Sequence, residues 1–359
     1  SDTLQVKSTH IVIQTIFWYN LGFPNPLIGN QVRHILIISS IFLFSFTIIS
    51  CKSSDDVLTS SNGLFVTVGG TGTILTSSDG NSWNERTSGI SKSIYGVTYG
   101  NGTFVTVGDN GTILTSSDGT SWNERTSGIS KSIYGVTYGN GTFVAVGGEL
   151  LVNGTILTSS DGISWTSRTS GTSNLLYRIT YGNSTFVTVG WEGTLLTSSD
   201  GISWDNRTSG TSNLLSGVTY GNGLFVVVGR YGTILTSSDG ISWTSRTSGT
   251  SKSLYGVTYG NGTFVTVGYS ITSSSTSTSD NSTPTITTEK STTTLTSSDG
   301  VTWTLRDSGT SNELRGKITY GNGLFVTVGW EGTLLTSSDG ISWDNRTSGT
   351  TNNLVGVTY

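Results

Sequence analysis

Short apolar stretches alternate with glycine-containing turns along most of the chain. In segment 214–249 the stretches read LLSGVTY, LFVVVG, TILTSS and ISWTSRTSG, and the turns between them read GNG, RYG and DG. Asn-Gly and Asp-Gly favour tight hairpins, because both residues of each pair tolerate positive φ. The pattern predicts four short β-strands, which we call runs a, b, c and d in chain order.

Apolar residues occupy both faces of these predicted strands. In run b, Phe225 and Val227 point to one side, and Val226 and Val228 point to the other, because side chains alternate along a strand. A two-layer sandwich buries one face of each sheet, whereas a β-propeller packs each four-stranded sheet between two others. The pattern therefore predicts an all-β propeller built from antiparallel blades of about 40 residues.

The unit recurs seven times, which sets the number of blades. Its first copy begins at run b, and a lone run a ends the chain at Leu354–Tyr359. We expect this last strand to complete the first blade, because joining the two ends in one sheet removes an open edge. The stretch Val57–Ser60 is a rival first strand. The predicted domain is thus a seven-bladed β-propeller over residues 62–359.

Each copy carries the signature SxDGxxW between runs c and d. This signature resembles the Asp-box, or BNR, repeat of sialidases and related propellers, with one residue fewer between the aspartate and the aromatic residue. The whole unit is most similar to propellers of the photosystem II assembly factor type. A carboxylate in a tight turn can accept backbone N–H hydrogen bonds, and seven identical corners suit a ring better than seven reaction centres. We therefore expect a structural role for the repeated aspartates, which are Asp79, Asp118, Asp161, Asp200, Asp239, Asp299 and Asp339.

Composition narrows the chemistry open to this chain. The formal net charge is −4 and no long basic run occurs, so a nucleic-acid partner is not supported. Cys51 is the only cysteine, and the two histidines, His10 and His34, precede it. The repeat region therefore lacks the residues for thiol catalysis, histidine-based triads and His/Cys zinc sites. We predict no catalytic residue, no metal and no cofactor.

The N-terminal region predicts a membrane attachment. Residues 35–49 form an uncharged apolar run that is short for a membrane span but fits a signal-peptide core behind Arg33. The sequence Ile48-Ile49-Ser50-Cys51 resembles the lipobox of bacterial lipoproteins, a resemblance that implies cleavage before Cys51 and lipidation of that residue. The alternative is an uncleaved N-terminal helix with an incidental cysteine.

This reading divides the region before the propeller into three parts. Residues 32–51 are the predicted signal peptide, and residues 52–61 are a polar tether. Residues 1–31 are an unexplained extension; one hypothesis is that translation starts at Val32 and that the preceding residues are mis-translated upstream sequence. The implied location is the bacterial cell envelope, with the protein lipid-anchored at the outer membrane or cell surface.

Differences between the otherwise similar copies indicate where function could lie, because loops on a rigid scaffold carry it. The differences gather in the connectors between runs b and c and in the links between run d and the next run a. In an up-and-down blade these two sets share one face of the ring, and the Asp turns lie on the other. The candidate binding residues are Trp191, Glu192, Arg230, Tyr231, Trp330, Glu331, Asp109 and Tyr269.

Two alternatives remain open for these loops. Exposed Trp and Tyr beside charged residues suit recognition of a protein or glycan, but Trp191 and Trp330 could equally cap the strands beneath them. The Ser/Thr-rich insert 269–294 predicts a mobile loop, with a longer hairpin as the alternative because threonine runs favour extended structure.

The favoured function is a non-catalytic, surface-anchored binding or scaffolding propeller with an unknown glycan or protein ligand. One alternative is a sialidase-like glycoside hydrolase, which needs paired carboxylates; Glu192 and Glu331 lie three units apart and are not expected to meet. The other alternative is an envelope or complex assembly factor.

Overall fold

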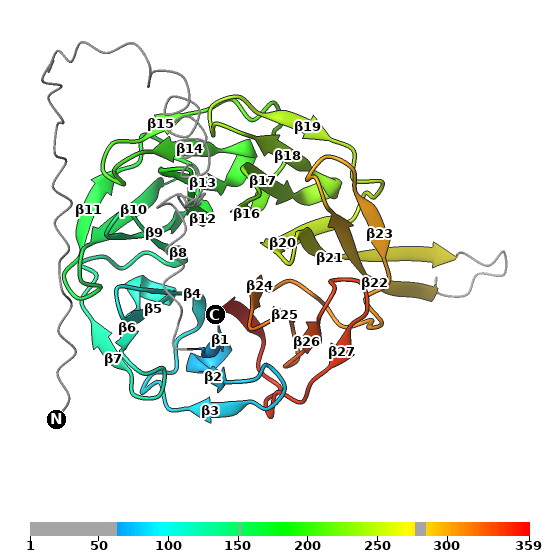
Figure 1. The fold of residues 1–359 in the computed structure, drawn as a ribbon, viewed down its shortest axis with the longest axis horizontal. Helices are drawn as coiled ribbons and strands as arrows, with labels where there is room; N and C mark the ends of the chain where they lie inside the picture. Colours follow the sequence, from blue (N-terminus) through cyan, green and yellow to red (C-terminus); the bar gives the residue numbers. More distant parts are fainter. Residues whose placement is uncertain (1–62, 151, 277–284) are drawn as a thin grey trace, which may run out of the picture. The chain divides into compact units, whose positions relative to one another are not determined.

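The structure is a computed structural model, and it describes residues 63–150, 152–276 and 285–359. Seven four-stranded antiparallel sheets are arranged around a centre (Figure 1). This confirms the seven-bladed all-β propeller. The predicted signal peptide, Cys51 and the rival strand at Val57–Ser60 lie outside the described residues. Within the described ranges, no helix is long and apolar enough to cross a membrane.

Each blade runs from an inner to an outer strand, and the inner strands line the centre of the ring. Blade 1 contains β28 (Leu354–Thr358), β1 (Phe65–Gly69), β2 (Ile74–Ser77) and β3 (Asn84–Arg86). Blade 2 contains β4 (Ile94–Gly100), β5 (Thr103–Gly108), β6 (Ile113–Ser116) and β7 (Asn123–Arg125). Blade 3 contains β8 (Ile133–Gly139), β9 (Thr142–Glu149), β10 (Asn153–Ser159) and β11 (Thr166–Thr169). Blade 4 contains β12 (Leu176–Gly182), β13 (Thr185–Gly190), β14 (Leu195–Ser198) and β15 (Asp205–Asn206).

The remaining three blades repeat this order. Blade 5 contains β16 (Leu215–Gly221), β17 (Leu224–Gly229), β18 (Ile234–Ser237) and β19 (Thr244–Arg246). Blade 6 contains β20 (Ser253–Gly260), β21 (Thr263–Thr276), β22 (Thr285–Ser297) and β23 (Thr304–Arg306). Blade 7 contains β24 (Ile318–Gly321), β25 (Leu324–Val328), β26 (Leu334–Ser337) and β27 (Asp344–Asn345).

The C-terminal strand closes the ring, as the count of runs predicts. β28 pairs antiparallel with β1, and Val66 lies opposite Thr358 in the register. The Thr67 hydroxyl donates to the Gly356 carbonyl at 2.8 Å. The two ends of the propeller are therefore held together by one sheet, in which β28 covers the inner edge of β1.

The hydrophobic core is divided among the interfaces between blades. Seven buried clusters each combine side chains of two neighbouring blades; the cluster between blades 7 and 1, for example, joins Val326 and Leu334 to Phe65 and Leu354. Phe225 in blade 5 has no exposed surface and packs 4.6 Å, centroid to centroid, from Tyr220. Both faces of each sheet are buried, because each blade is packed between two others.

The Ser/Thr-rich insert forms a long hairpin rather than the expected loop, so the alternative reading was the right one. β21 and β22 stay paired from Phe264↔Ser297 out to Thr276↔Thr285, and they project beyond the rim of the ring (Figure 1). Threonine favours extended structure, and backbone pairing between two strands requires no apolar side chains. A Ser/Thr-rich segment can therefore form this hairpin. Residues 277–284 at its tip lie outside the described ranges.

Candidate functional site

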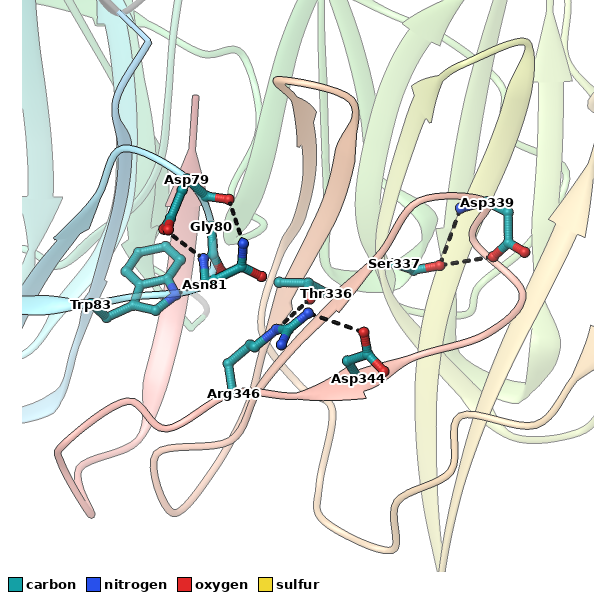
Figure 2. A network of polar contacts seen from close by, with 9 residues as sticks. All are labelled: Asp79, Gly80, Asn81, Trp83, Thr336, Ser337, Asp339, Asp344 and Arg346. Carbon is teal, nitrogen blue, oxygen red and sulfur yellow. Dashed lines mark hydrogen bonds and ion pairs between the residues drawn. The ribbon is translucent and has the colours of Figure 1, made fainter.

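The Asp turns have the same hydrogen bonds in every blade. In the first copy, the Asp79 carboxylate accepts a bond from the Asn81 backbone N–H at 2.8 Å (Figure 2). It also accepts bonds from the Ser82 backbone N–H at 2.9 Å and from the Ser77 hydroxyl at 3.0 Å. These donors lower the pKa of Asp79, with the Ser82 N–H as the largest cause. Gly80 takes φ +75°, a conformation that glycine adopts without strain. Each aspartate thus stabilises the turn to which it belongs.

All seven repeated arginines and six of the seven repeated tryptophans also bond within their own blades; the Trp343 indole N–H is buried without an acceptor among the described residues. The Trp83 indole N–H donates to the Gly80 carbonyl at 3.0 Å. The arginine Nε of the outer strand donates to a threonine hydroxyl on the neighbouring strand, and Arg346 adds an ion pair with Asp344 at 3.0 Å (Figure 2). The seven arginines with this bond are Arg86, Arg125, Arg168, Arg207, Arg246, Arg306 and Arg346.

The variable loops lie on the side of the ring opposite the Asp turns. We call this side the connector face, and the side of the Asp turns the Asp-turn face. The connector face comprises the connectors between second and third strands and the links between blades. Four connectors are single 3-10 turns: η1 (Gly70–Gly72), η2 (Asp109–Gly111), η3 (Trp191–Gly193) and η4 (Arg230–Gly232). Backbone bonds tie connectors to links, as from the Trp191 N–H to the Leu175 carbonyl at 2.9 Å. Identical backbone turns therefore present different side chains.

Four of the predicted residues come together between blades 4 and 5. Trp191, Glu192, Arg230 and Tyr231 line one hollow of about 510 Å³, together with the link residues 211–214. The Arg230 guanidinium lies 5.6 Å from the centroid of the Trp191 ring, which is within cation–π range. Tyr231 is 69 % exposed. We call these four residues the blade 4–5 hollow.

Other hollows at the rim of the ring arise from the repeat itself. One of about 720 Å³ lies between blades 2 and 3, and one of about 680 Å³ lies at blade 1. Both are lined mainly by the serine, threonine and glycine residues of the links that every blade shares. The blade 4–5 hollow differs because two large aromatic side chains and two charged side chains line it.

The connector turns hold non-glycine residues at positive φ. Tyr231 has φ +55°, and Glu192 and Glu331 have φ +51° and +53°. This region is uncommon for residues other than glycine, asparagine and aspartate, and holding a bulky side chain there costs on the order of 1 kcal/mol. Since Tyr231 is exposed and adds nothing to the core, the fold itself gives no reason for an aromatic residue there.

A second group of candidates meets between blades 6 and 7. The Arg315 guanidinium lies 4.5 Å from the Trp330 ring centroid and 5.2 Å from that of Tyr269, and it pairs with Glu313 at 2.9 Å. Trp330 is 38 % exposed. Glu331, next to it, uses its backbone N–H to bond Asn353 at 3.0 Å.

Tyr269 does not lie on the surface, although it was expected among the binding residues. It is 1 % exposed, because β21 continues through it and places its ring beneath Arg315. Its hydroxyl donates to the Glu313 carboxylate at 3.0 Å. Burial, followed by this bond, raises the pKa of Tyr269 to about 12. Tyr269 can therefore position Glu313 and Arg315 but cannot itself cover a ligand.

Asp109 joins a row of tyrosines that the sequence analysis did not single out. Its carboxylate accepts hydrogen bonds from the Tyr95 hydroxyl at 2.8 Å and the Ser132 hydroxyl at 3.1 Å. Tyr95 stacks on Tyr134 at 5.1 Å, and Tyr134 packs against Tyr177 at 5.4 Å. A common position, the second residue of β4, β8 and β12, was the signal that could have identified this row.

The candidates thus form separate groups on the connector face. Glu192 lies on blade 4 and Glu331 on blade 7, with blades 5 and 6 between them. In the described ranges, no three His, Cys, Asp or Glu side chains gather as a metal site requires. The groups described on this face combine aromatic and charged side chains, as in Trp191 with Arg230 and Trp330 with Arg315.

No family profile matches the sequence, and no curated protein sequence matches it. Solved structures share its fold. YCF48 bound to a D1 peptide aligns with a TM-score of 0.52 at 17 % identity, covering 71 % of this chain and 80 % of that one. YCF48 from Cyanidioschyzon merolae aligns with a TM-score of 0.50 at 15 % identity, covering 73 % and 87 %. A computationally designed protein, Ika8, aligns with a TM-score of 0.50 at 11 % identity, covering 82 % and 93 %. At these identities the likeness shows the propeller fold alone.

Proposed function

We propose that this propeller is a non-catalytic binding protein that holds a segment of a partner protein on its connector face. The observation that carries the proposal is the blade 4–5 hollow. There, residues that differ between copies converge from consecutive blades. The repeated aspartates and arginines, by contrast, bond within their own blades.

The hollow has the chemistry of a protein-binding surface. Aromatic and arginine side chains are enriched at interface positions that dominate binding, because they offer large contact areas and directional polar groups. Trp191 and Tyr231 supply the rings, and Arg230 supplies donors for carbonyl or carboxylate groups. The exposed Tyr231 has a positive φ, which is energetically unfavourable for tyrosine. Strained residues of this kind are concentrated at functional sites.

A precedent exists among proteins of the same fold, since YCF48 has been solved with a D1 peptide bound. That structure supports a peptide as a ligand class for a propeller of this architecture.

The experiment is a binding screen of the full chain against arrays of peptides and glycans. The test variant replaces Arg230 and Tyr231 by Asp and Asn, the pair that the same turn carries at Asp109 and Asn110. The turn backbone is kept, so the variant should fold. The control is Ile241→Thr, which copies Thr120 onto the exposed Asp turn of blade 5.

Peptide binding that the double variant loses and Ile241→Thr retains would support the proposal. Peptide binding retained by both variants would move the site away from the hollow. Glycan binding in place of peptide binding would favour a lectin. Hydrolysis of a glycan, which the sialidase-like alternative requires, would overturn the non-catalytic assignment.

We also propose that Cys51 carries a lipid that holds the propeller at a bacterial envelope membrane. Support comes from the apolar run before Cys51 and from its lipobox-like sequence. Mass spectrometry of the mature N-terminus tests this: a lipid-modified cysteine is expected. A mature protein that retains residues before Cys51 would contradict it.

A further inference from the structure

All seven inner strands contribute to a cavity of about 170 Å³ along the centre of the ring. Most of its lining is the repeated Val/Ile-Thr pair of the inner strands. One position on the inner strands differs between blades. In blade 2 it is Gly96, which lies opposite Val107. The position is glycine in five blades, but Arg178 in blade 4 and Lys317 in blade 7.

Glycine at this position has a packing reason. A Cβ atom added at Gly135 or at Gly217 would lie 2.9 Å from a carbonyl oxygen of the next blade. Real Cβ atoms do not approach backbone this closely, so a side chain there forces the neighbouring strand to shift. Two long cationic side chains at this position therefore work against the packing that the other five blades use.

The two cations also lack carboxylate partners. No aspartate or glutamate lines the cavity, and no described carboxylate forms an ion pair with Arg178 or Lys317. Arg178 Nη1 donates to the Tyr134 and Tyr177 carbonyls at 2.6 and 3.2 Å. Its Nε is buried and has no acceptor among the described residues. A buried donor without an acceptor is costly, so Arg178 is not explained by the packing of the scaffold.

The charges also act on each other. Burial and the nearby Arg178 guanidinium lower the pKa of Lys317 to about 7. Burial lowers the pKa of Arg178 to about 10. Like charges held in one partly desolvated cavity destabilise each other, and an anion between them would remove that repulsion.

We propose that the central cavity binds a small oxyanion, a carboxylate or phosphate-like group, between Arg178 and Lys317. The Arg178 guanidinium and the Lys317 amine both line the cavity and supply its positive charge. Threonine hydroxyls from the surrounding strands can supply neutral donors; the lining threonines are Thr98, Thr137, Thr219, Thr258 and Thr358. The volume suits a single anionic group rather than a folded partner. This site is independent of the blade 4–5 hollow.

Sulfate is the first probe, since its charge does not change near neutral pH. The full chain is titrated with sulfate by calorimetry and by thermal unfolding, against chloride at equal ionic strength. Arg178→Gly and Lys317→Gly restore the residue found in five blades, so both should fold. Each should weaken sulfate binding about tenfold or more, as expected for loss of a charged hydrogen bond, and the double variant should not bind.

The control for loss of charge is Lys92→Asn. Lys92 is exposed in a link between blades, and asparagine occupies the equivalent position as Asn174 and Asn213. This variant should bind sulfate as the unmodified chain does. Stabilisation by sulfate no greater than by chloride would overturn the proposal, as would sulfate binding that survives in the double glycine variant.

A pH series adds a readout that packing alone would not change. Sulfate affinity should fall as pH rises through about 7, because Lys317 then loses its proton. Arg178 stays charged there, and the neighbouring tyrosines stay neutral because burial raises the pKa values of Tyr134 and Tyr177. In Lys317→Gln this pH dependence should disappear, and a dependence that persists would count against the assignment.

Competition against sulfate identifies the source of the anion. Inorganic phosphate tests a free ion, and a short peptide with a free C-terminal carboxylate, beside its amide, tests the end of a partner chain. Displacement by phosphate alone supports a free anion. Displacement by the acid peptide and not by the amide supports a chain end that enters the cavity.

Discussion

The Asp-turn face and the connector face are built on equally regular backbones. The side chains of the Asp-turn face are nearly the same in every blade, whereas those of the connector face vary. On the Asp-turn side, the backbone N–H two residues after each aspartate donates to its carboxylate at 2.8 Å in all seven blades. On the connector face, one turn geometry carries Gly-Thr, Asp-Asn, Trp-Glu or Arg-Tyr. Repetition of side chains marks the scaffold, and variation on a constant backbone marks where binding can specialise.

The Asp-turn face also has exposed apolar residues, but they do not form a binding site. Ile163, Ile202, Ile241 and Ile341 are 41 to 55 % exposed in the Asp turns. Each belongs to a different blade, and singly scattered apolar residues are normal on protein surfaces. In the blade 4–5 hollow, by contrast, aromatic and charged side chains from two blades share one concave site.

The largest effect should follow from the core between blades. Phe225→Ala should lower the free energy of unfolding by about 3–5 kcal/mol, because Phe225 has no exposed surface and its loss leaves a cavity between blades 4 and 5. Urea unfolding followed by fluorescence measures this, and Phe225→Leu should lose much less. A loss below about 1 kcal/mol for Phe225→Ala would mean that neighbouring blades repack freely.

Acid should weaken the Asp-turn face next. The folded-state pKa values of the turn aspartates lie below the ordinary value, chiefly because backbone N–H groups bond the carboxylates, and that of Asp299 is about 2. Groups lowered in this way contribute stability above about pH 4, and the contribution is lost as pH falls toward 2. Unfolding free energies at pH 5, 4, 3 and 2 should fall more steeply for the unmodified chain than for Asp299→Asn. Equal slopes would contradict the role given to these turns.

A smaller effect should come from the repeated arginine bond. Arg246 Nε donates to Thr236 Oγ1 at 2.8 Å, and such a bond contributes about 1 kcal/mol. A double-mutant cycle with Arg246→Ala and Thr236→Val should show a coupling of this size. Coupling near zero would mean that the arginine is only a solvated edge residue.

The smallest change in stability should come from the connector face. Replacing Arg230 and Tyr231 by Asp and Asn should leave the unfolding free energy unchanged or raise it by up to about 1 kcal/mol, because asparagine tolerates positive φ better than tyrosine. Thermal and urea unfolding measure this. Strong destabilisation would show that Tyr231 serves packing after all.

The fold could be predicted from the sequence because its strongest signals are local and repeated. Apolar residues on both sides of run b required burial on both faces of the sheet. The lone strand at Leu354–Tyr359 was expected to complete the first blade, with Val57–Ser60 as its rival, and it pairs with β1. The insert was harder, because its serines and threonines suit both a loop and a ladder, and only the pairing of β21 with β22 decides between them.

The candidate site was predicted in part. Trp191 and Tyr231 could be singled out because they differ from their counterparts, but the sequence could not show that they share one hollow. The row of Tyr95, Tyr134 and Tyr177 was missed because a register shift lies at the start of each inner strand. Such a bulge re-aims side chains, and simple alternation does not reveal it. Lys317 was missed because only alignment of the inner strands shows it in a glycine position.

The most direct test of the contrast between the two faces is one comparison of peptide binding. The unmodified chain, the Arg230→Asp/Tyr231→Asn variant and the Ile241→Thr variant would be measured against the same peptide array, with unfolding free energies determined in parallel. All three proteins should have equal stability within about 1 kcal/mol, and only the connector-face variant should lose binding. Binding lost in Ile241→Thr and kept in the connector-face variant would place recognition on the Asp-turn face and contradict the account.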